Sequence, residues 1–169
     1  MLNIENRNTE TTIEKRIVVH ASRARVWRAV ADSKEFGIWF GMRVEGPFVA
    51  GTVVRGVMAP TEIDPEVAAM QKPHEGAPFA LTVETMDPER VFAFRWHPSA
   101  VDRGTDYSAE PTTLVTFTLA DEGTGCVVTV TESGFEHIPL ARRAQAFTSN
   151  DGGWTAQMRL IARYLETRP

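Results

Sequence analysis

The stretch that decides the fold is LARRAQAFTSNDGGWTAQMRLIARYL, residues 140–165. Apolar side chains recur in it at alternating steps of four and three residues, a spacing that places them on one face of a helix. The row, with one acidic member, is Leu140, Ala144, Phe147, Asp151, Trp154, Met158, Ile161 and Leu165. Largely off the row are Arg142, Arg143, Gln157, Arg159 and Arg163. We therefore predict an amphipathic helix with one face against the rest of the chain.

Most of the chain before this helix alternates as β-strands do. We predict strands at residues 13–20, 51–58, 79–86, 91–97, 112–119 and 125–133. In the last three, one face carries Phe92, Phe94, Trp96, Val115, Phe117, Leu119, Val128 and Val130. The other face is mostly threonine and charge, with Val127 as an apolar exception, which predicts an antiparallel sheet covered on one side.

Two short helices and a cover complete the predicted elements. Ser22 can cap a helix after the first strand, and Asp32 or Ser33 can start a second short one that ends at Gly37. The segment 59–78 holds four prolines, and an Asp64–Pro65 pair in it can open a short helix. We expect this segment to be a mobile cover over a binding site.

Composition limits the class of protein. The 169 residues, 43% hydrophobic and 24% charged, fit one globular domain, which we place at residues 13–167 after a flexible tail at 1–12. A net charge of -4 without a basic face argues against a nucleic-acid partner. Because Cys126 is the only cysteine and no stretch resembles a secretion signal or a membrane span, we expect a cytoplasmic protein.

The order of elements resembles the helix-grip fold of the START and birch-pollen-allergen (SRPBCC) superfamily. Five strings carry the resemblance in the same order: residues 17–27, Trp39-Phe40, 88–96, 132–135, and Gly153-Trp154 followed by Met158 and Leu165. They are similar to the branch named after the activator of the heat-shock-protein-90 ATPase. The resemblance implies an α+β fold in which a curved antiparallel sheet wraps around a long C-terminal helix, with two short helices after the first strand. It implies no single function, because the superfamily includes lipid carriers, hormone receptors, polyketide cyclases and co-chaperone domains.

Several kinds of chemistry find no support in the residues. His20, His74, His97 and His137 are far apart and show no metal-ligand spacing, so we expect no metal site. Cys126 has no activating pattern beside it, which favours a buried thiol over a nucleophile. The glycines form no nucleotide fingerprint, and one cysteine cannot hold an iron–sulfur cluster. We therefore expect no cofactor.

The remaining candidates form an aromatic and methionine set, which is typical either of a packed core or of the lining of a ligand pocket. As ligand-binding residues we predict Trp39, Phe40, Met58, Phe94, Trp96, Glu132, Phe135, Phe147, Trp154 and Met158. Glu132 continues the inward row of its strand, so its carboxylate needs a hydrogen-bonding partner, an arginine or a ligand. Asp151 is either a polar anchor on the helix row or the cap of a helix that restarts there.

We expect the protein to bind a small hydrophobic or aromatic molecule, lipids included, between sheet and C-terminal helix. The first alternative is a cyclase or hydratase that uses Glu132 or Asp151, the only catalytic candidates, as general acid or base. The second is a co-chaperone-like interaction module, although the outer sheet offers mostly threonine for docking. A binding protein is favoured over an enzyme, and the sequence leaves a homodimer open.

Overall fold

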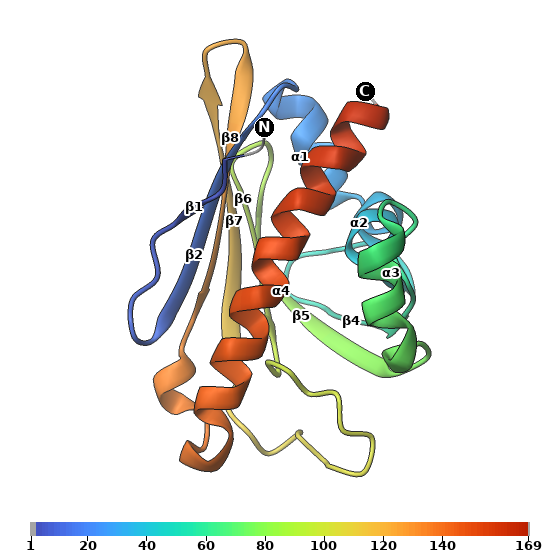
Figure 1. Cartoon of the computed structure of the whole chain (residues 1–169), viewed down its shortest axis with the longest axis vertical. Coiled ribbons are helices and arrows are strands. Elements are labelled where there is room, and N and C mark those ends of the chain that lie inside the picture. The colour runs from blue at the N-terminus through green and yellow to red at the C-terminus, as the bar shows by residue number, and fades with distance from the viewer. Residues whose placement is uncertain (1–2, 169) are drawn as a thin grey trace.

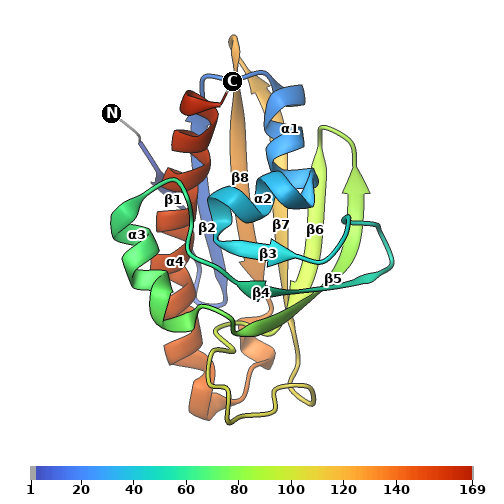
Figure 2. The same cartoon turned by 90° about the vertical axis from the view of Figure 1, so that its right-hand side faces the viewer.

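The computed structural model describes residues 3–168 as one antiparallel sheet that curves around a long helix (Figures 1 and 2). The eight strands follow the spatial order β1-β2-β8-β7-β6-β5-β4-β3. Their bounds are β1 Glu5–Asn6, β2 Thr12–Val19, β3 Met42–Val44, β4 Val53–Met58, β5 Pro78–Asp87, β6 Val91–Trp96, β7 Thr113–Glu122 and β8 Gly125–Ser133. The helices are α1 Arg23–Ala31, α2 Ser33–Phe40, α3 Pro65–Gln71 and α4 Leu140–Thr167, with short 3-10 turns η1 Lys72–His74 and η2 Phe135–His137. This architecture confirms the predicted α+β helix-grip fold.

The inward face of the sheet follows the alternation in the sequence. Across three neighbouring strands Ile17 lies opposite Val128, and Val128 lies opposite Leu119; all three side chains are buried. The face also carries one residue that the alternation did not single out: Lys15, which is 2% exposed. Figure 2 shows α4 along this face, with β3, β4 and β5 bending around its other side.

The two short helices begin where the sequence predicts but the second ends later. Ser22 Oγ accepts from the Arg25 amide (3.1 Å), and Asp32 Oδ1 accepts from the amides of Lys34 and Glu35. The predicted end at Gly37 is wrong, because α2 continues to Phe40 and ends at Gly41, whose φ of 102° suits glycine. Gly37 is needed inside the helix because a Cβ there would meet the Met42 carbonyl oxygen at 2.3 Å.

Helix α4 is one continuous helix of 28 residues, so a restart at Asp151 is wrong. The predicted row is buried in its second half, from Trp154 to Leu165, but Leu140 at its start is 80% exposed. The first turns lie beside η2 and the loop after β6 instead of over the sheet (Figure 1), which explains their exposure. Gln157, predicted off the row, is 8% exposed because its amide donates to the Phe40 carbonyl (3.0 Å).

The N-terminal segment contains a short pairing. Glu5 and Asn6 of β1 lie opposite Arg16 and Lys15 of β2. The predicted flexibility of residues 1–12 stays a prediction, and residues 1–2 lie outside the described part of the chain.

Two glycine-to-alanine changes should have opposite effects on stability. Gly37→Ala should lower the free energy of unfolding by about 1–3 kcal/mol, because a backbone carbonyl cannot make room for the new Cβ. Gly152→Ala, in α4, adds a Cβ that meets nothing within 4 Å and should raise it by about 0.5–1 kcal/mol. Urea unfolding of both variants measures this. Equal effects would contradict the close approach of α2 to Met42.

Candidate functional site

The polar centre of the fold is the carboxylate of Glu132, on the inward face of β8 and fully buried. It lies between Ile13 of β2 and Val115 of β7. Oε1 accepts from Trp154 Nε1 (2.8 Å) and Asn150 Nδ2 (2.9 Å) of α4. Oε2 accepts from Trp96 Nε1 (2.7 Å), Thr113 Oγ1 (2.6 Å) and, at 3.1 Å, Asn150 Nδ2. The carboxylate therefore joins three strands to the central helix.

Every donor to this carboxylate is a neutral group. Within residues 3–168 no lysine, arginine or histidine forms an ion pair with Glu132, so the salt bridge to an arginine that the sequence left open is wrong. A buried carboxylate is costly unless it is hydrogen-bonded, and bonds to an ionised acceptor are the stronger kind. Two indoles, a hydroxyl and an amide supply those bonds here, and they hold both oxygens.

A pocket of about 670 Å³ lies next to this hydrogen-bond network. Trp96 and Asn150, both donors to Glu132, are also part of its wall. The apolar residues of the wall are Phe40, Met42, Met58, Ala77, Pro78, Phe79, Ala80, Trp96, Ala100 and Val101. The polar residues are Arg55, His97, Ser99, Asp102, Arg103, Thr105, Asp106, Tyr107, Ser149 and Asn150. Of the residues predicted to bind a ligand, the structure places Phe40, Met58 and Trp96 on this wall.

The other predicted residues pack elsewhere. Trp39, Phe94, Trp154 and Met158 are all at most 2% exposed. Their place is the core between sheet and helix, where Trp154 packs on Phe40 and Phe117 at ring distances of 5.8 Å. Phe135 of η2 and Phe147 of α4 form a separate pair whose ring centroids are 5.0 Å apart. The space between the sheet and the second half of α4 is thus filled, and the pocket lies beside it.

One wall of the pocket comes from the loop between β6 and β7, residues 97–112, to which the sequence analysis assigned no role. Arg142 of α4 holds this loop: its guanidinium pairs with Glu110 (2.8 Å), donates to the Pro98 carbonyl (3.0 Å) and lies over the Tyr107 ring. The length of this loop could have identified it as part of a site from the sequence, because long connections without regular structure are often functional.

The predicted cover, residues 59–78, forms α3 and η1 beside α4 (Figure 2). Asp64 caps α3 as predicted, accepting from the amides of Glu66 and Val67. Gln71 Nε2 donates to the Phe40 carbonyl (3.0 Å), the same oxygen that Gln157 of α4 reaches. Ala77 and Pro78 line the pocket, whereas residues 67–70 do not. The mobility of this segment stays a prediction.

Asp151 lies away from the pocket, on the β1–β2 side of α4. Its Oδ1 accepts from Lys15 Nζ (2.6 Å) and Asn8 Nδ2 (2.7 Å). Burial alone would raise the pKa of this carboxyl, but the hydrogen bonds from Lys15 and Asn8 and the charge of Lys15 outweigh it, so the pKa lies below its usual value. Asp151 therefore compensates the charge of the buried Lys15, and it does not line the pocket beside Asn150.

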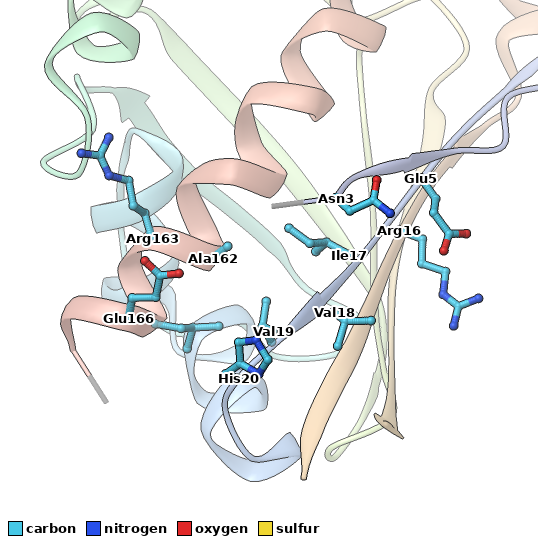
Figure 3. Close-up of a pocket in the computed structure, with 11 residues that line it drawn as sticks. Asn3, Glu5, Arg16, Ile17, Val18, Val19, His20, Ala162, Arg163 and Glu166 are labelled. Atoms are coloured by element: carbon cyan, nitrogen blue, oxygen red, sulfur yellow. The ribbon is translucent and has the colours of Figure 1, made fainter. Parts of the chain in front are cut away.

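A second hollow, of about 590 Å³, lies between β2 and the end of α4. Figure 3 shows that its residues project from the outer strands and the last turns of the helix. None of the predicted ligand-binding residues lines it, and its labelled groups are a mixture of polar and aliphatic side chains such as His20, Val18 and Glu166. Within residues 3–168 no cluster of His, Cys, Asp and Glu is suited to a metal ion, and no helix is long and apolar enough to cross a membrane.

Replacing the central carboxylate by its amide should destabilise the fold. In Glu132→Gln one acceptor oxygen becomes an NH₂ group that faces donors; Thr113 can rotate its hydroxyl to accept, but an indole N–H cannot. We expect the free energy of unfolding to fall by about 1–3 kcal/mol for one buried donor left unpaired. The control is Glu136→Gln, an exposed glutamate just past β8, which should change little. Chemical denaturation of both measures the difference; equal stabilities would show that the indole bonds are weak.

The Lys15–Asp151 pair should show in the pH dependence of stability. Because the folded-state pKa of Asp151 is lowered, its contribution is fully present above the unfolded pKa of about 3.9 and is lost as the pH falls through the folded-state value. Asp151→Asn should be less stable than the wild type near neutral pH, with a gap that narrows below about pH 4. Urea midpoints over this range test it, and a constant gap would exclude the linkage.

Solved structures with the same fold share little sequence with this chain. DynU16, a protein of the dynemicin biosynthetic locus, is 24% identical with a TM-score of 0.66; the match covers 94% of this chain and 48% of DynU16, so the chain spans about half of that protein. A protein from Arthrobacter aurescens is 15% identical with a TM-score of 0.71, covering 98% of this chain and 91% of that one. CalU16 from Micromonospora echinospora is 14% identical with a TM-score of 0.60, covering 100% and 85%. At these identities the likeness shows the fold alone.

The comparison with family models shows the family of the chain as well as its fold. No curated protein matches the chain. Residues 20–166, however, match the family described as Activator of Hsp90 ATPase homolog 1-like protein, and this range includes the helices, the pocket wall and the Glu132 network. The chain therefore belongs to that family, within the SRPBCC superfamily whose helix-grip fold it shares.

Proposed function

We propose that the protein binds a small hydrophobic or aromatic molecule in the pocket beside α4. The observation that carries the proposal is the wall itself: Phe40, Met58 and Trp96 present apolar surface on one side, and Asn150 adds a polar group next to them. Ligand sites in proteins are mostly apolar with a few placed polar groups, and about 300–1,000 Å³ is their usual size. Methionine and aromatic side chains adapt to irregular apolar ligands.

The geometry supports binding better than it supports acid–base catalysis. A general acid or base must come within hydrogen-bond reach of the substrate. Glu132 is fully buried and both its oxygens are held by protein donors, while Asp151 is paired with Lys15 and does not line the pocket. The ligand contacts that we propose are therefore made by the wall residues, and Glu132 acts through them by fixing Trp96 and Asn150.

The remaining parts of the proposal concern the ligand class and the setting. The apolar wall suits both a fatty chain and an aromatic ring, so lipids stay within the proposed ligand class. We also propose a cytoplasmic setting, which suits the only cysteine: Cys126 is buried as a free thiol, and burial raises its pKa.

A charge placed in the apolar wall should weaken binding without unfolding the protein. Met58→Lys introduces an ammonium group beside Phe40 and Trp96, and we expect it to weaken the binding of 2-naphthol at least about tenfold, because the charge must be desolvated when the pocket fills. Met70→Lys makes the same change on α3, where the side chain is 74% exposed and outside the pocket, and should leave the affinity unchanged. Equilibrium dialysis measures both.

Thermal melts of the two variants serve as the folding control. If 2-naphthol binds the wild type and both variants equally, its site is elsewhere and the pocket proposal fails.

A further inference from the structure

The Glu132 carboxylate fixes the orientation of the Asn150 amide. The Asn150 NH₂ group faces Glu132, because its Nδ2 donates to Oε1 at 2.9 Å and to Oε2 at 3.1 Å. The carbonyl Oδ1 then lies on the opposite branch of the amide. Among residues 3–168 no group donates to Oδ1, and Asn150 is part of the pocket wall. The amide cannot turn over, since a carbonyl would then face two carboxylate oxygens.

The same carboxylate fixes what Trp96 offers to the pocket. Its Nε1–H donates to Glu132 Oε2, so the indole can contribute only its apolar surface to a ligand. Three other polar residues of the wall each make a bond within the protein: His97 Nε2 lies 3.0 Å from the Glu110 carbonyl oxygen, Arg103 donates to the Glu75 carbonyl, and the Tyr107 hydroxyl accepts from the Asp102 amide. Beside the aromatic floor, Asn150 Oδ1 is thus a fixed acceptor that lacks a donor.

We propose that the ligand is an aromatic molecule carrying a hydroxyl or similar donor, which binds with its ring on Trp96 and Phe40 and donates to Asn150 Oδ1. This inference rests on the proposed function and narrows its ligand class to hydrogen-bond donors. A ligand without a donor would leave the acceptor desolvated and unpaired, whereas a donor of the same size satisfies it. Asn150 is then the residue that determines specificity, and Glu132 positions it.

The test compares two probes of the same size, 2-naphthol and 2-methylnaphthalene, by equilibrium dialysis against the wild-type protein. Hydrophobic burial alone favours the methyl compound, because it has no hydroxyl to desolvate. We expect the opposite order, with 2-naphthol bound roughly fivefold more tightly, the size of one net hydrogen bond. If both probes bind and the methyl compound is preferred or equal, the donor requirement is overturned while the pocket stands. If neither binds, the proposed function fails together with this inference.

Two variants in the same helix locate the acceptor. Asn150→Ala should reverse the order of the two probes, and Thr148→Ala, at an exposed position of α4 outside the pocket, should leave the order unchanged. Loss of the preference in Thr148→Ala as well would overturn the assignment to Asn150. Because Asn150→Ala also removes a donor from Glu132, thermal melts accompany the dialysis, and the wild-type comparison of the probes stands without any variant.

Discussion

The buried carboxyl group of Glu132 organises the interior of this protein. The carboxylate of Glu132 is out of contact with water, and the groups that compensate it come from β6, β7 and α4. Such a group is stable only when all its donors are in place together. The helix therefore cannot shift along the sheet without breaking bonds to both Trp154 and Asn150. These bonds tie α4 to the sheet in one register.

The hydrogen bonds to Glu132 also lie at the boundary between the packed core and the pocket. Trp154 turns its indole into the filled part of the interior, whereas Trp96, bonded to the same carboxylate, has part of its ring on the pocket wall. The aromatic rings of Phe36, Phe92 and Phe117 pack against one another within the filled core. One interaction thus marks the boundary between tightly packed side chains and the hollow beside them.

The fold was predictable from the sequence because its signals are local. Alternation identified six of the eight strands; β1 and β3, of two and three residues, are too short to show it. The oxygen-bearing side chains of Ser22, Asp32 and Asp64 identified the helix starts, and the spacing of Trp154, Met158 and Leu165 identified the buried half of α4. The site was only partly predictable. Periodicity shows that Phe94 and Trp96 face inward, but it carries no information on whether the space they face is filled. Lys15 and Gln157 were missed because their burial depends on partners far along the chain, Asp151 and the carbonyl of Phe40.

The carbonyl oxygen of Phe40, at the end of α2, accepts from amides on two different elements: Gln71 of α3 and Gln157 of α4. The predicted cover and the central helix are therefore hydrogen-bonded to the same backbone oxygen. Arg163 of α4 also pairs with Asp64 at the start of α3, so α3 is joined to α4 directly as well as through Phe40. Loss of the Gln71 bond alone would therefore leave α2 held by Gln157 and α3 held by Arg163. The end of α2, the predicted cover and the central helix form one connected unit beside the pocket wall.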